Sequence, residues 1–80
     1  MYLKELENEN TLTILNSKEF FLTNREHEVA ELILKGLSNK EIANYLSISV
    51  NTVRTHIDRI LSKTGSNNKM SAIFKLCNND

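Results

Sequence analysis

Four polar residues that could read the edges of DNA bases lie close together near the middle of the chain. They are Asn51, Arg54, Thr55 and Asp58. Arginine pairs with O6 and N7 of guanine, asparagine with adenine and aspartate with N4 of cytosine, while threonine can contact the thymine methyl group. Early positions of such a helix usually reach the bases. The residue types and their order therefore indicate a recognition helix that enters the major groove.

The helix that must carry these residues has an apolar stripe on its other side. At 100° per residue, the four polar residues fall opposite or beside Val53, Ile57, Ile60 and Leu61. Taken alone, this pattern is more often that of a surface helix with one face in water. The DNA interpretation depends on the rest of the chain.

The distribution of charge favours a nucleic-acid partner although the net charge is zero. From Ser38 to Lys69 there are five basic residues and two acidic ones, whereas Met1 to Leu22 contain four acids and two lysines. A phosphate backbone meets local charge and not the average over the chain. The middle of the sequence is thus a basic segment preceded by an acidic tail.

Start and stop signals divide the chain into helices. There is no proline, there are only two glycines, and no alternating strand pattern follows Leu22, so the sequence predicts an all-α domain. The predicted signals are capping boxes at Thr23 with Glu26 and at Ser38 with Glu41, N-caps at Ser49 and Asn68, and helix ends at Gly36 and Gly65.

Two of these helices form a predicted helix-turn-helix. Only Ser47, Ile48 and Ser49 separate the helix that begins at Ser38 from the one that runs to about Thr64. This turn often contains a glycine, and here it has none. A fourth helix is predicted from Lys69 to Cys77. The expected organisation is an N-terminal tail with partial order (1–21), one helical domain (22–77) and a frayed C-terminus (78–80).

The composition argues against several other classes of protein. No apolar run reaches the roughly 20 residues that span a bilayer, and the acidic N-terminus is unlike a signal peptide, so we expect a cytoplasmic protein without membrane contact. Cys77, His27 and His56 lack the spacing of metal ligands. Because neither a nucleophile–base pair nor a phosphate-binding glycine loop is present, we expect no enzyme activity, cofactor or small-molecule ligand.

The segment from Leu22 to about Leu76 resembles the LuxR-type helix-turn-helix domain, in particular the small stand-alone members that are similar to a spore regulator. The matching residues are Leu22, Thr23, Arg25, Glu26, Glu28, Val29, Gly36, Ser38, Glu41, Ile42, Ala43, Leu46, Ile48, Thr52, Val53, His56, Ile60, Lys63, Gly65 and Ala72. The resemblance implies a four-helix domain that binds double-stranded DNA as a homodimer, pairs through its last helix and regulates transcription.

The resemblance also implies roles for individual residues. Arg54 matches a basic position that contacts bases or phosphates, and Thr55 and Asp58 match variable positions that set sequence preference. Residues expected at phosphates are Ser49, Thr52, Lys63 and Lys69, of which Lys69 replaces an arginine and so loses bidentate geometry. The expected dimer interface comprises Met70, Ile73, Phe74 and Cys77, although helical spacing also allows these residues to be core.

Some assignments stay open on the sequence alone. His56 is either a structural histidine or a DNA contact, and Arg25 is either an ion-pair partner on the scaffold or a DNA ligand. Phe20, Phe21 and Leu22 are expected to pack at the start of the first helix. Two rival functions remain: a module that touches RNA polymerase, because sigma-factor domains use a similar helix-turn-helix, and a protein-interaction regulator that pairs with full-length relatives.

Overall fold

A computed structural model describes residues 15–77, and this range holds four helices and no strand. The helices are α2 (Asn24–Leu34), α3 (Asn39–Leu46), α4 (Val50–Thr64) and α5 (Lys69–Cys77). The predicted all-α fold is confirmed. The expectations for residues 1–14 and for the frayed C-terminus at 78–80 lie outside the described residues. None of the four helices has the length and apolar character needed to cross a membrane.

Both predicted capping boxes are present. At the start of α2 the Thr23 hydroxyl accepts the Glu26 N–H at 3.1 Å, and the Glu26 carboxylate accepts the Thr23 N–H at 3.0 Å. Ser38 and Glu41 make the same exchange at the start of α3, at 3.2 and 2.8 Å. Each box satisfies backbone donors that the first turn leaves without helical partners, which fixes where the helix begins.

The two later helices have simpler caps. The Ser49 hydroxyl accepts the Thr52 N–H at 3.0 Å at the start of α4. The Asn68 side chain accepts the Ser71 N–H at 2.9 Å at the start of α5. The N-caps predicted at Ser49 and Asn68 are therefore confirmed.

Three helix ends use left-handed backbone, and one of them is not a glycine. Gly36 and Gly65 have φ of +94° and +67° and follow α2 and α4, as predicted. In the helix-turn-helix, Ser47 takes this role with φ +59°, and the Ile48 N–H donates to the carbonyl of Ala43 at 3.0 Å. A side chain in this region costs about 1–2 kcal/mol. The turn thus forms without the usual glycine, at some cost in backbone energy.

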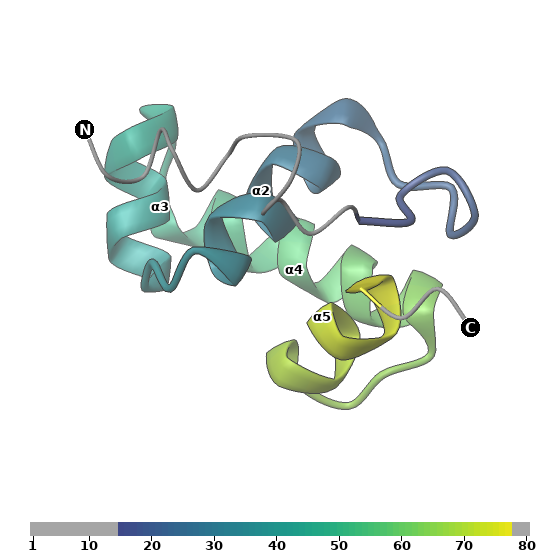
Figure 1. Cartoon of the computed structure of the whole chain (residues 1–80). Helices are drawn as coiled ribbons and strands as arrows, with labels where there is room; N and C mark the ends of the chain where they lie inside the picture. Colours follow the sequence, from purple (N-terminus) through teal and green to yellow (C-terminus); the bar gives the residue numbers. More distant parts are fainter. Residues whose placement is uncertain (1–14, 78–80) are drawn as a thin grey trace.

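Helix α4 is the centre of the fold. It packs against α2, α3 and α5, and within the described chain α3 and α5 lie toward opposite ends of it without packing against each other (Figure 1). Its predicted core positions Val53, Ile57 and Ile60 are buried. The buried apolar residues are Leu15, Val29, Ala30, Leu32, Ile42, Ala43, Val53, Ile57, Ile60, Ala72, Ile73 and Leu76. Each of the other three helices therefore packs part of its buried face against α4.

The end of the predicted N-terminal tail packs on the helices. Leu15 is buried in the core, and the Asn16 N–H donates to the carbonyl of Leu76 in α5 at 2.9 Å. Phe20 and Leu22 pack against the core as expected. Phe21 does not: its φ is +60° and it is 82% exposed, so the expectation that it packs is wrong. Phe21 lies in the turn formed by residues 17–22, where its left-handed backbone accompanies a side chain that points into solvent.

Candidate nucleic-acid interface

The four predicted base-contacting residues share the solvent side of α4. Asn51, Arg54, Thr55 and Asp58 are all exposed, while the opposite face of the helix is buried. Neighbours three and four positions apart lie on the same face of a helix, which brings Arg54 near Asp58 and Asn51 near Thr55. The structure thus gathers the predicted set on one accessible surface, as the apolar period required.

The polar side chains on this surface make few contacts with the rest of the described chain. Although the i, i+4 spacing permits an ion pair, none joins Arg54 to Asp58 among the residues that the structure describes. The Thr55 hydroxyl donates to the carbonyl of Asn51 at 3.1 Å. The hydroxyl is therefore partnered locally, while the threonine methyl group remains for an apolar contact.

The predicted phosphate-contacting residues are in three different situations. Ser49 and Thr52 are exposed at the start of α4, and their hydroxyl oxygens lie 2.9 Å apart in a hydrogen bond. The Lys69 ammonium donates to the side-chain oxygen of Asn39 at 3.0 Å, which links the start of α5 to the start of α3. Lys63 faces the scaffold. For all four residues the phosphate role stays a prediction.

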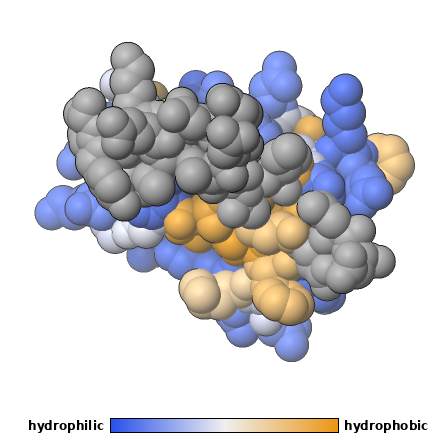
Figure 2. All heavy atoms as spheres, in the orientation of Figure 1, coloured by the Kyte–Doolittle hydropathy of each residue, from blue (hydrophilic) through white to orange (hydrophobic). Residues whose placement is uncertain are grey.

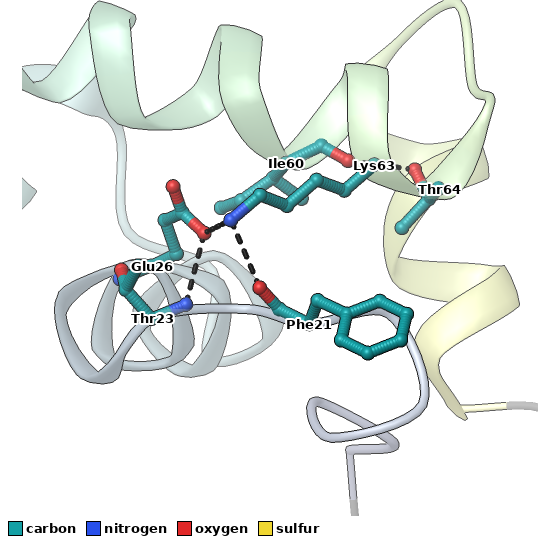
Figure 3. Close-up of polar contacts among 6 residues, drawn as sticks. All are labelled: Phe21, Thr23, Glu26, Ile60, Lys63 and Thr64. Atoms are coloured by element: carbon teal, nitrogen blue, oxygen red, sulfur yellow. Dashed lines mark hydrogen bonds and ion pairs between the residues drawn. The ribbon is translucent and has the colours of Figure 1, made fainter.

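The Lys63 side chain runs from α4 to the beginning of α2 (Figure 3). Its ammonium lies 2.6 Å from the Glu26 carboxylate and donates to the carbonyl of Phe21 at 2.9 Å. Glu26 is only 1% exposed. Burial on its own would raise the pKa of the Glu26 carboxyl, but hydrogen bonds from Lys63 and the Thr23 N–H outweigh it and lower that pKa, with help from the charges of Lys63 and Arg59.

Sequence reasoning found Glu26 as a capping residue and missed its counter-ion. The two residues are 37 positions apart, so no local pattern links them. It also gave no role to Lys75, whose ammonium donates to the carbonyls of Thr64 and Gly65 at 3.1 and 3.0 Å. A cation at these carbonyls stabilises the end of α4. A possible sequence signal for this role is that Lys75 lies in the helix that follows a helix ending at glycine, but this signal is weak.

Helix α5 presents part of its predicted interface to solvent. Met70 and Phe74 are 76% and 69% exposed, and Figure 2 shows hydrophobic residues gathered over this helix. Cys77 is half-buried, and burial raises the pKa of its thiol. Ile73 is buried in the core, one residue before exposed Phe74, which corrects the expectation that Ile73 belongs to the exposed interface. The apolar residues of α5 therefore divide between core and surface.

Two residues with open assignments can now be located. Arg25 lies 3.1 Å from Glu28 in an exposed ion pair, which agrees with a scaffold role. His56 lies at the core edge, and its Nδ1 is buried without a hydrogen-bond partner within the described chain. Among residues 15–77 no group of three or more His, Cys, Asp or Glu side chains could hold a metal ion.

Comparison with known proteins places this architecture in a family. The family described as bacterial regulatory proteins, luxR family, matches residues 21–76. Over 53 residues the chain is 46% identical to the response regulator protein VraR of Staphylococcus aureus (strain Mu3), and equally to the proteins of that name in Staphylococcus saprophyticus and Staphylococcus epidermidis. The match covers 66% of this chain and a quarter of each relative. The chain therefore belongs to the luxR family of bacterial regulatory proteins and carries its helix-turn-helix DNA-binding domain.

Proposed function

We propose that this chain is a sequence-specific transcriptional regulator that binds double-stranded DNA as a homodimer, with one α4 in each major groove. The observation that carries the proposal is the surface formed by Asn51, Arg54, Thr55 and Asp58, which is exposed while the reverse of α4 is core. A major groove admits a helix presented in this way. The likeness to response regulators supports a role in gene control.

Sequence would be read mainly by Arg54 and Asp58. A bidentate pair between arginine and guanine discriminates against the wrong base by about 1–3 kcal/mol. An exposed ion pair between the same two side chains, by contrast, would contribute only about 0.3–0.5 kcal/mol. The two charged groups make no such pair in the described chain, so binding DNA breaks no internal contact at this position. Asn51 and Thr55 would add contacts at neighbouring base pairs.

Register on the duplex would come from contacts near both ends of this surface. The hydroxyls of Ser49 and Thr52 lie at the N-terminus of α4, where backbone N–H groups and the helix dipole favour an anion. Lys69 would add a cation from the start of α5, beside Asn39 at the start of α3. These contacts position the protein on DNA without reading its sequence.

The dimer would form through α5. Met70 and Phe74 are large apolar side chains in water, one turn apart on the same helix, and Cys77 extends the row. A second copy of the helix would remove this surface from water. A symmetric pair of domains would then address two half-sites about one helical turn of DNA apart, or a multiple of it.

Selection of bound sequences from a random DNA pool, at stated salt, tests the proposal. We expect a palindromic product with a preferred guanine–cytosine pair in each half-site. Enrichment of a single, unpaired half-site would point to a monomer, as in a sigma-like module that works on RNA polymerase. No enrichment together with tight pairing to a full-length relative would instead identify a protein-interaction regulator.

Sedimentation of a Met70→Glu/Phe74→Glu variant tests the dimer. We expect a folded monomer that binds a palindromic duplex much more weakly than the parent protein does. Tyr45→Glu is the matched control, because Tyr45 is an aromatic residue of similar exposure on α3. Equal loss of association in both variants, or an unchanged dimer in the double variant, would exclude α5 as the interface.

A further inference from the structure

We propose that Lys63 is a positioning residue, which together with buried Glu26 fixes the C-terminal end of α4 and does not bind a DNA phosphate. The proposal rests on the DNA-binding function proposed above and assigns this lysine a different task from the one its place on the recognition helix suggests. A basic residue late in that helix would ordinarily be assigned to the phosphate backbone.

The ammonium of Lys63 already has two oxygen partners. It lies 2.6 Å from Oε1 of Glu26 and 2.9 Å from the carbonyl oxygen of Phe21 (Figure 3). These distances are those of charge-assisted hydrogen bonds. The side chain is 31% exposed, so its position is partly shielded from solvent. To reach a phosphate, Lys63 would have to give up both of these contacts.

The partner that Lys63 would leave cannot be solvated in place. Glu26 is 1% exposed, and the same oxygen that accepts from Lys63 also accepts the Thr23 N–H in the capping box. A buried carboxylate that loses its counter-ion is strongly destabilising. Moving Lys63 to DNA would therefore weaken the start of α2 as well as the pair itself.

The contact joins three parts of the chain that must keep a fixed relation. Phe21 belongs to the turn of residues 17–22, Glu26 to the first turn of α2 and Lys63 to the last turn of α4. Phe21 has left-handed backbone, and its carbonyl is directed at the ammonium while its ring points away (Figure 3). The last turn of α4 is thus held against the start of α2 and the preceding turn by a cation with two oxygen partners.

The most direct test is Glu26→Gln, because the two roles predict opposite results. Glutamine can still accept the Thr23 N–H in the capping box, but it offers Lys63 no charge. If Lys63 positions α4, affinity for the selected palindromic duplex falls several-fold in protein that remains fully folded. If Lys63 is a phosphate ligand, releasing it from Glu26 leaves the affinity unchanged or raises it, and that result overturns the proposal.

A pair of neutralising variants separates positioning from charge on DNA. Lys63→Met alone leaves Glu26 buried and unpaired, so its unfolding equilibrium constant should rise about 30-fold or more. Glu26→Gln/Lys63→Met removes both charges, and we expect most of that loss to be recovered. This cycle is measured without DNA, so its outcome is independent of the proposed function.

Salt dependence of binding completes the test. Each lost phosphate contact lowers the slope of log K against log salt by about 0.9 for B-DNA. The double variant should keep the parent slope, whereas Lys69→Met, the matched lysine control, should lower it by about 0.9 per monomer. A lower slope in the double variant overturns the positioning role. Absence of specific binding by the parent protein would instead refute the proposed function, with the stability cycle unaffected.

Discussion

The two ends of α4 use the same kind of residue in different ways. Near its beginning, Arg54 is exposed and makes no ion pair within the described chain. Near its end, Lys63 is held by a buried carboxylate and a backbone carbonyl, and Lys75 caps the last carbonyls. The beginning of α4, with Arg54, is its open end, where the charge is available to a partner. The last turn, with Lys63, is its fastened end, where the charge is bound within the domain.

This difference shows that a basic residue on a recognition helix is not by itself a DNA contact. Arg54 and Lys63 are nine positions apart, half a turn round the helix, so they face opposite directions. Whether a charge is available depends on what the neighbouring helix brings to it. Here α2 brings a buried glutamate to the end of α4, and the described residues bring no counter-ion to Arg54.

The largest expected effect comes from removing charge at the fastened end. We expect Lys63→Met to lower the free energy of unfolding by about 2–3 kcal/mol, somewhat less than for a fully buried pair because Lys63 is 31% exposed. Arg54→Met should change it by less than about 0.5 kcal/mol. Urea unfolding followed by circular dichroism measures both. Similar values for the two variants would remove the distinction between the ends.

At the open end the expected loss is in DNA binding and not in folding. Arg54→Ala should cost about 1–3 kcal/mol of specific affinity and relax the preference at one base pair, because its bidentate contact is lost. The measurement is pool selection repeated with the variant, beside a titration on random DNA. If every base preference is retained while affinity falls uniformly, Arg54 is a phosphate contact.

Acid should act mainly on the fastened end. The folded state lowers the pKa of Glu26 from 4.5, so the unfolded chain binds the proton more readily than the folded protein. The stabilisation is therefore fully present above pH 4.5 and is lost as pH falls through the lower folded value. Unfolding free energies of the parent and of Glu26→Gln, measured from pH 3 to 7, should converge at the acid end of this range. Parallel curves would contradict the coupling.

The smallest expected effect concerns the turn that leads into the open end. Ser47 has φ +59°, which glycine adopts without strain. Relief of this strain by Ser47→Gly should stabilise the domain by up to about 1 kcal/mol. The higher conformational entropy of glycine in the unfolded chain reduces this gain. A thermal melt measures the shift, and Ser62→Gly in the last turn of α4, where the backbone is helical, should destabilise the domain by about 0.5 kcal/mol. A loss of stability at Ser47 would mean that its side chain matters more than its backbone.

The sequence by itself determined where the helices begin and end. Thr23 with Glu26, Ser38 with Glu41, and Ser49 act on backbone groups within one turn, so their effect can be read from adjacent residues. The apolar period of α4 likewise determined that Asn51, Arg54, Thr55 and Asp58 share the exposed side. These features depend on contacts a few positions apart.

Only the tertiary structure decided which of the chemically suitable side chains are available. It buried Ile73 beside exposed Phe74, turned Phe21 out into solvent, and brought Glu26 to Lys63 across 37 positions. Each outcome depends on how segments of the chain lie against one another, which no periodic pattern encodes. A side chain's chemistry is written in the sequence, but its accessibility and its counter-ion come from residues that only folding makes neighbours.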